Sequence, residues 1–184
     1  MSKRVLVTGF EPFDGDSVNP SMEFLKWLEK NSYDFKLHTE LLPVSFTQSI
    51  PKLDEAIKHF RPTHVILTGL AKNRKELTLE RIGINWVDAR IPDNDGLTLK
   101  AQKILAEGED GIFTTLPLDV MMSAAKSVGC ETKVSTSAGE YVCNYVIYRF
   151  LSEFKKTPGV FIHLPGVDDY EVIFRGIEAI AKAI

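Results

Sequence analysis

Short apolar runs alternate along this chain with longer segments of helical periodicity, and that alternation limits the folds open to it. Thr63–Thr68 reads THVILT, a continuous apolar run typical of a parallel strand covered on both faces. Asn19 can cap a helix that begins at Pro20, a residue suited to the first helical position. Leu25 and Leu28 then share one face of that helix. The pattern predicts an α/β fold with a mostly parallel, twisted central sheet.

The other expected elements continue the alternation. Strands are expected at Arg4–Thr8, Phe35–Leu42, Ile112–Thr115, Lys133–Thr136 and Gly159–Leu164, and helices at Thr47–Phe60, Asp119–Ser127, after Gly139 and near Tyr170–Ile184. The stretch Leu77–Asp93 interrupts the alternation, and we interpret it as a hairpin or an edge excursion.

Size and charge exclude several classes of protein. The 184 residues are 44% apolar, enough to bury one core, so we expect residues 1–184 to form a single domain. The 22 basic and 25 acidic residues give a net charge of −3, and no Lys/Arg cluster suggests a nucleic-acid partner. No apolar run reaches the roughly 18 residues of a membrane span. The start, MSKRVLVTGF, does not resemble a signal peptide, so we expect a cytoplasmic location and no membrane partner.

The two cysteines are each considered separately. Cys130 and Cys143 belong to no CxxC pair and have no paired histidines, so the sequence predicts no metal site. A reducing compartment would keep both as thiols. Cys130 follows Gly129 after a helical segment and is interpreted as a structural residue.

Cys143 has the more unusual setting. It follows Gly139 at the expected start of an apolar helix, where unpaired N–H groups and the helix dipole stabilise a thiolate. Taken alone, a buried structural cysteine is the commoner explanation. A nucleophile held where the chain turns is the alternative, and it requires a base within hydrogen-bond reach.

His163 and Glu80 are the candidate partners of that thiol. His163 ends the expected strand Gly159–Leu164, and ligands collect beyond the carboxyl ends of parallel strands. Glu80 would share a face with Ile82 and Ile84 if the segment is extended, a costly place for an unpaired carboxylate. It is either a solvated glutamate of an edge strand or the residue that orients a catalytic imidazole.

Two loops carry further candidates. Arg90 precedes the loop marked by Pro92, where it could hold an oxyanion or a surface carboxylate. Phe10 and Phe13 lie on the glycine-bounded turn GFEPFDG, where they either enter the core or wall a pocket. The residues alone therefore suggest a hydrolase with a possible Cys-His-acid set.

Five segments together resemble the pyrrolidone carboxyl peptidases, also called pyroglutamyl peptidases type I. They are VLVTGFEPFDGDSVNPS, LTLERIGINWVDARIPDNDG, FTTLPL, STSAGEYVCNYVIY and FIHLP, in this order over nearly the whole chain. The resemblance implies a three-layer α/β/α sandwich that hydrolyses the amide after an N-terminal pyroglutamyl residue. It implies no metal and no cofactor, peptides with N-terminal pyroglutamate as substrates, and a homodimer or homotetramer.

The resemblance also implies roles for individual residues. Cys143 would be the nucleophile, His163 the general base and Glu80 the acid that orients it, with Arg90 near the oxyanion. The expected substrate pocket consists of Phe10, Phe13, Ile91, Tyr141 and Val142.

The chain departs from the family's pattern in the charged segment GLAKNRKE and in a short interval between Cys143 and His163. Two other functions therefore stay open. One is a catalytically silent relative that binds capped peptides. The other is a thiol hydrolase of different lactams or small amides.

Overall fold

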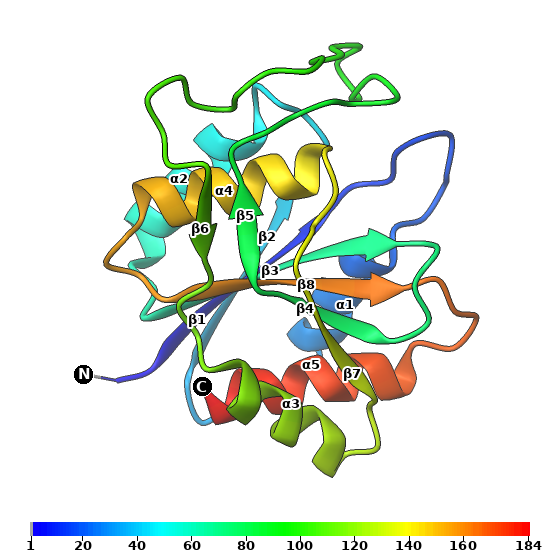
Figure 1. Cartoon of the computed structure of the whole chain (residues 1–184). Coiled ribbons are helices and arrows are strands. Elements are labelled where there is room, and N and C mark those ends of the chain that lie inside the picture. The colour runs from blue at the N-terminus through cyan, green and yellow to red at the C-terminus, as the bar shows by residue number, and fades with distance from the viewer. Residues whose placement is uncertain (1) are drawn as a thin grey trace.

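A six-stranded sheet forms the centre of the protein, whose computed structural model describes residues 2–184 (Figure 1). The strand order is β2-β1-β3-β8-β4-β7, and β5 and β6 form a separate two-stranded sheet. The strands are β1 (Arg4–Phe10), β2 (Lys36–Leu42), β3 (His64–Ala71), β4 (Leu77–Glu80), β5 (Ile82–Ile84), β6 (Gly111–Phe113), β7 (Thr132–Ser135) and β8 (Gly159–Pro165). The helices are α1 (Pro20–Glu29), α2 (Ser49–Phe60), α3 (Leu118–Ser127), α4 (Val142–Glu153) and α5 (Glu171–Ala183).

The helices lie in two layers, one on each face of the large sheet. In Figure 1, α2 and α4 lie above the sheet, and α3 and α5 lie below it. Helix α1 packs in the same core as α3 and α5. Strand residues alternate between the two cores: Val160, Ile162 and Leu164 of β8 pack with α1, α3 and α5, whereas Phe161 packs with α2 and α4. The predicted three-layer α/β/α architecture is confirmed.

The sheet is mostly parallel, with one antiparallel pair in its interior. Pairs β1–β2, β1–β3, β3–β8 and β4–β7 are parallel, and β4 runs antiparallel to β8. The interpretation of Leu77–Asp93 as a hairpin or edge excursion is wrong for its first four residues, because β4 is an interior strand between β8 and β7. Leu77 and Leu79 are fully buried in the core on one face, which explains why this strand belongs inside the sheet.

Local signals located most elements to within a few residues. Asn19 caps α1 as predicted, since its side-chain oxygen accepts a hydrogen bond from the Ser21 amide at 3.0 Å. The longest helix among residues 2–184, α5, has 13 residues, and none of the helices there combines the length and apolar character needed to cross a bilayer.

Candidate active site

Cys143 is the second residue of α4. The chain leaves β7 at Ser135, turns through Gly139 at a φ of 83° and begins the helix at Val142. A positive φ of this size strains any residue with a side chain, so glycine suits the turn. The residue before the helix, Tyr141, provides no side-chain cap, which leaves the first N–H groups of α4 available to another acceptor. The predicted position of the thiol at a helix start is confirmed.

The thiol lies against the sheet where β3 and β8 pair. A methyl group added to Gly69 of β3 would come within 3.2 Å of the Cys143 sulfur. Gly69 is the register partner of His163 on β8. The absence of a side chain at Gly69 therefore lets the start of α4 approach the strand pair that carries the imidazole.

Glu80 and His163 meet across the antiparallel pair β4–β8. The Glu80 carboxylate oxygen Oε1 lies 2.8 Å from His163 Nδ1, and the two residues are 0% and 3% exposed. The interpretation of Glu80 as a solvated edge-strand residue is thus wrong. It also does not share an extended face with Ile82 and Ile84, because β4 ends at Glu80 and β5 belongs to the other sheet.

Arg74 is a third partner in this cluster and was missed by the sequence analysis. Its guanidinium group makes an ion pair with Glu80 through the same oxygen, Oε1, that faces His163. It also donates to the backbone oxygen of Ser137 at 2.9 Å. The available signal was the charged segment GLAKNRKE, but the sequence does not indicate which of its charges turns inward.

Burial and neighbouring charge set the protonation of the cluster. Burial acts to raise the pKa of Glu80, but its hydrogen bond to His163, the charge that His163 carries when it is protonated, the Ser135 hydroxyl and Arg74 together lower it below its usual value. Burial lowers the pKa of His163, although Glu80 opposes this effect. Burial and Glu80 raise the pKa of the Cys143 thiol to about 12. The resting site therefore holds a carboxylate, a neutral imidazole and a neutral thiol.

This protonation state differs from the thiolate that the helix-start position alone suggests. The N-terminal turn of α4 and the Arg74 charge do lower the pKa of Cys143, but burial has the larger effect. A thiolate at Cys143 would therefore form only by proton transfer to a base. Because Nδ1 of His163 faces Glu80, Nε2 is the ring nitrogen left for that transfer.

A narrow apolar pocket adjoins the thiol. Its volume, about 20 Å³, is roughly the space of one water molecule. Four of the five predicted pocket residues line it, and the sequence analysis missed Asn19, Val44 and Leu70. The lining residues are Phe10, Phe13, Asn19, Val44, Leu70, Tyr141, Val142 and Cys143.

Hydrogen bonds between loops hold the walls of this pocket. The Tyr141 hydroxyl donates to the backbone oxygen of Pro92 at 2.9 Å. The side chain of Asn94 donates to the backbone oxygen of Pro12 at 2.9 Å. Asp93 is buried and accepts from the Phe46 amide at 2.8 Å. The loop that follows Arg90 therefore ties the phenylalanine turn to the residue preceding α4.

Arg90 and Ile91 are not brought to the pocket. Arg90 is exposed, and its side chain makes no hydrogen bond or ion pair with any other residue of the described range 2–184. Ile91 is half-buried and does not line the apolar pocket. Their predicted roles, at the oxyanion and at the substrate ring, therefore stay predictions.

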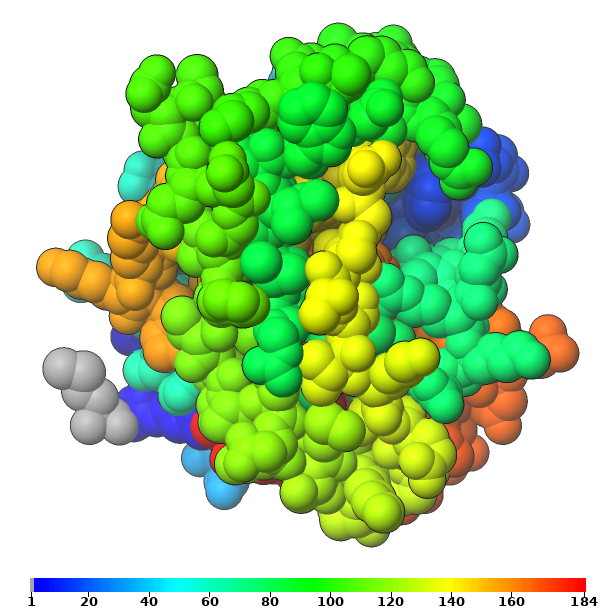
Figure 2. Space-filling view, viewed as in Figure 1, coloured from blue at the N-terminus to red at the C-terminus, as the bar shows by residue number. Residues whose placement is uncertain are grey.

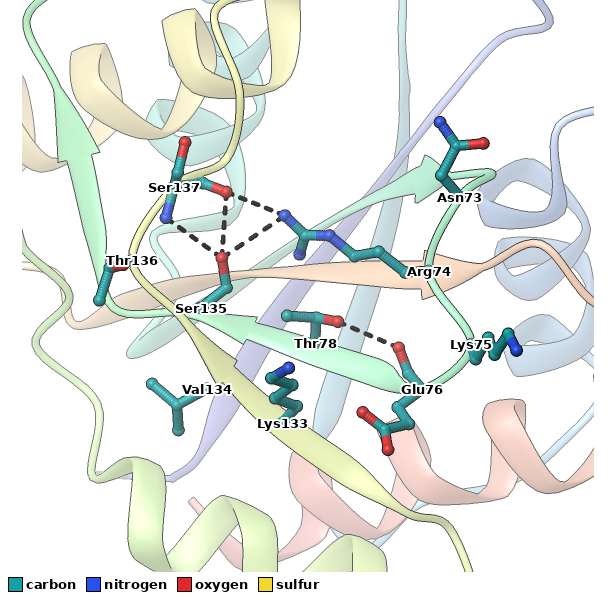
Figure 3. Close-up of a pocket in the computed structure, with 10 residues that line it drawn as sticks. All are labelled: Asn73, Arg74, Lys75, Glu76, Thr78, Lys133, Val134, Ser135, Thr136 and Ser137. Carbon is teal, nitrogen blue, oxygen red and sulfur yellow. Dashed lines mark hydrogen bonds between the residues drawn. The ribbon is translucent and has the colours of Figure 1, made fainter.

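A larger polar groove lies on the other side of the cluster. It has a volume of about 590 Å³ and is formed by the β3–β4 loop, by β7 and by the segment that follows β7. Figure 3 shows the Arg74 guanidinium reaching across it toward Ser135 and Ser137. In the space-filling view the segment between β7 and α4 runs down this face as a yellow band, beside the blue-green β3–β4 loop (Figure 2).

Within residues 2–184, no group of three or more His, Cys, Asp or Glu side chains is arranged to hold a metal ion.

Known proteins resemble this chain in sequence and in fold. A family model described as pyroglutamyl peptidase matches residues 3–177. The chain is 40% identical to a pyrrolidone-carboxylate peptidase of Thermosipho melanesiensis, over 88% of this chain and 82% of the relative. It is 39% identical to one of an Enterobacter species, over 97% and 86%. The pyroglutamyl peptidase I of Bacillus amyloliquefaciens superposes with a TM-score of 0.93 at 33% identity, over 100% of this chain and 96% of that one.

Proposed function

This chain belongs to the pyroglutamyl peptidase family, cysteine peptidases that remove N-terminal pyroglutamate, and we propose that Cys143, His163 and Glu80 perform that reaction in it. The observation that carries the assignment is the buried Glu80–His163 contact of 2.8 Å. His163 is the register partner of Gly69, against which the Cys143 sulfur lies. An imidazole oriented by a carboxylate and adjacent to a thiol is the arrangement that nucleophilic catalysis by cysteine requires.

The first step makes the nucleophile. His163 takes the thiol proton at Nε2, and the Cys143 sulfur attacks the carbonyl carbon of the amide that follows the pyroglutamyl ring. Glu80 stabilises the imidazolium that forms, because its carboxylate accepts a hydrogen bond from the Nδ1–H group. Transfer within the buried cluster overcomes the raised pKa of the thiol, since the two charges form next to each other.

Attack on the carbonyl gives a tetrahedral intermediate, and its oxyanion needs hydrogen-bond donors. The uncapped N–H groups at the start of α4 lie next to the sulfur and point outward from the helix, which suits them to this role. Removing one such donor typically costs about 3 kcal/mol of transition-state stabilisation. Arg90 would add to this stabilisation if its exposed side chain folds over the bound substrate.

Collapse of the tetrahedral intermediate breaks the amide bond. His163 gives its proton to the leaving amine, which departs as the shortened peptide, and the pyroglutamyl group remains on Cys143 as a thioester. Water attacks the thioester with His163 again as base, and free pyroglutamate and the thiol are released.

The apolar pocket accounts for selection of the lactam. Its walls are aromatic and aliphatic, and the side chain of Asn19 is already engaged with Ser21 and with the backbone of Glu11. An uncharged ring fits these walls, whereas the ammonium of an ordinary N-terminus would be buried without a partner. Because the free pocket is narrow, the ring can enter only if the pocket walls move; two of these walls are Phe13 and Tyr141, whose ring centroids lie 6.1 Å apart.

The test is release of aminomethylcoumarin from its pyroglutamyl amide, beside the N-acetylalanyl amide and the Cys143→Ala variant. We expect turnover of the pyroglutamyl amide only, and none in the variant. A folded wild-type protein without turnover would favour a silent relative that binds capped peptides. Comparable turnover of both amides would favour a thiol hydrolase of broader range.

We further propose a homodimer or homotetramer in the cytoplasm. Two large exposed side chains support association: Trp86 after β5 is 38% exposed, and Phe113 in β6 is 63% exposed. The two free cysteines, Cys130 and Cys143, are suited to a reducing compartment. Light scattering after size exclusion tests the association, and a mass equal to one chain at working concentration contradicts it.

A further inference from the structure

Arg74 is held in place by its own backbone before its side chain reaches the site. Its amide donates to the oxygen of Ala71 at 2.9 Å, and its oxygen accepts from the Gly166 amide at 3.1 Å. These contacts fix Arg74 between the end of β3 and the residue that follows β8. The guanidinium group therefore projects from a constrained loop.

The guanidinium connects the acid of the cluster with the segment that leads to the nucleophile. One nitrogen, Nη1, pairs with Glu80 Oε1. The other, Nη2, lies 2.9 Å from the backbone oxygen of Ser137 and 3.4 Å from the Ser135 hydroxyl (Figure 3). The Ser135 hydroxyl also donates to Ser137 oxygen at 3.0 Å, so these two residues form a compact turn six residues before Cys143.

Glu80 depends on Arg74 for charge compensation. Its side chain is 0% exposed, and its second oxygen, Oε2, is buried without a hydrogen-bond partner among residues 2–184. A neutral His163 supplies only a hydrogen bond. Among the described residues, Arg74 is the one permanently charged group paired with this carboxylate. A buried carboxylate without such a partner is costly and tends to take up a proton.

We propose that Arg74 is a positioning residue for the hydrolysis: it keeps Glu80 ionised with Oε1 toward His163, and ties that carboxylate to the turn preceding Cys143. This inference rests on the proposed function for its kinetic part only. Arg74 contacts no reacting atom, so its effect passes through Glu80 and His163. An exposed ion pair would contribute little, but here the carboxylate is fully buried.

The test compares Arg74→Gln and Arg74→Lys with Arg81→Gln. Arg81 follows Glu80 directly but has an exposed side chain, so the same substitution there is a matched control. Turnover of pyroglutamyl-aminomethylcoumarin is measured between about pH 5 and 9. The rate at which iodoacetamide alkylates Cys143 is followed by peptide mass spectrometry over the same range, and thermal unfolding reports the folded fraction.

In Arg74→Gln we expect kcat to fall about tenfold or more, with KM changed by less than about threefold. The acid limb of kcat/KM should move to higher pH by about half a unit or more, since loss of the cation favours protonation of both Glu80 and His163. Alkylation of Cys143 should slow at neutral pH, because Arg74 lowers the pKa of this thiol. Arg74→Lys should keep the wild-type acid limb with an intermediate kcat, and Arg81→Gln should match the wild type.

An Arg74→Gln protein with wild-type kcat and acid limb would overturn the inference. So would a loss of kcat with both pH profiles unchanged, because that pattern indicates a merely structural contact. If the wild type does not cleave the substrate, the proposed function fails, and the alkylation profiles alone decide the role of Arg74. A shift of the alkylation profile in Arg74→Gln alone supports the positioning role of Arg74. Equal alkylation profiles for all three variants refute that role.

Discussion

Glu80 and His163 lie 2.8 Å apart although 83 positions separate them in the chain. The contact exists because β4 runs antiparallel to β8, which places Thr78 opposite His163 and Glu80 opposite Phe161. Both side chains then point to the face on which α4 begins. This pairing directs Nδ1 of His163 toward Glu80 and leaves Nε2 for the base role that we propose, and it is the basis of the predictions that follow.

We expect catalysis to depend on the negative charge of the Glu80 carboxylate rather than on its shape. Glu80→Gln keeps the volume and an oxygen facing Nδ1 but cannot stabilise an imidazolium. We expect kcat to fall about a hundredfold or more, measured with pyroglutamyl-aminomethylcoumarin. Glu76→Gln, at the exposed position just before β4, should keep wild-type kcat. Equal activity of the two variants would contradict a catalytic role for Glu80.

Activity is expected to rise with pH on the acid side. His163 acts as a base only when neutral, and burial holds its pKa below the ordinary value. The acid limb of kcat/KM should therefore lie below about pH 6.5, with a plateau by neutral pH. A pH series of kcat/KM measures it. A limb well above pH 7 would show that His163 is charged in the resting site.

Stability should depend on pH in the same direction. The lowered pKa of His163 means that the unfolded chain binds its proton more readily, so the free energy of unfolding falls as pH drops below about 6.5. The lowered pKa of Glu80 adds a further loss at more acidic pH. Urea unfolding should therefore give a smaller free energy of unfolding at pH 5 than at pH 7. His163→Gln should reduce that difference, whereas the exposed His59→Gln should retain it.

Asn144 is expected to hold the start of α4 in place. Its side chain is 0% exposed, accepts from the Ile84 amide at 3.0 Å, and donates to the Ile84 and Trp86 oxygens at 2.9 Å. Asn144→Ala leaves three backbone groups without partners, a loss of about 2–4 kcal/mol in unfolding free energy. Chemical denaturation measures it, with the exposed Asn31→Ala as control. A loss below about 1 kcal/mol would contradict this role.

The buried carboxylate of Asp93 should control the pocket wall. It accepts from the amides of Phe46, Asp95 and Leu97 at 2.8 to 3.0 Å. Asp93→Asn replaces one acceptor oxygen by an NH₂ group that faces a backbone N–H group, so we expect the loop to shift. We expect KM to rise about threefold or more with a smaller effect on kcat. Asp88→Asn, at a half-buried surface position, should leave KM unchanged. An unaltered KM in Asp93→Asn would show that the loop does not define the pocket.

Local sequence signals were sufficient for most of the fold. The Asn19 cap, the apolar run of β3 and the alternation along β8 each depend on residues a few positions apart, and each element appears where it was predicted. The segment that begins at Leu77 was misjudged for a related reason. Its four strand residues are too few to reveal whether a strand lies at an edge or inside a sheet.

The sequence by itself determined the alternation of elements, the turn at Gly139 and the location of Cys143 at a helix start, because these follow from periodicity and backbone preference over short distances. The resemblance of five ordered motifs added the family. Only the tertiary structure decided that Glu80 is buried, that Arg74 and His163 contact the same oxygen of Glu80, and that burial keeps the Cys143 thiol protonated. These properties depend on strand pairing and on exclusion of water by distant segments, and neither leaves a local pattern in the chain.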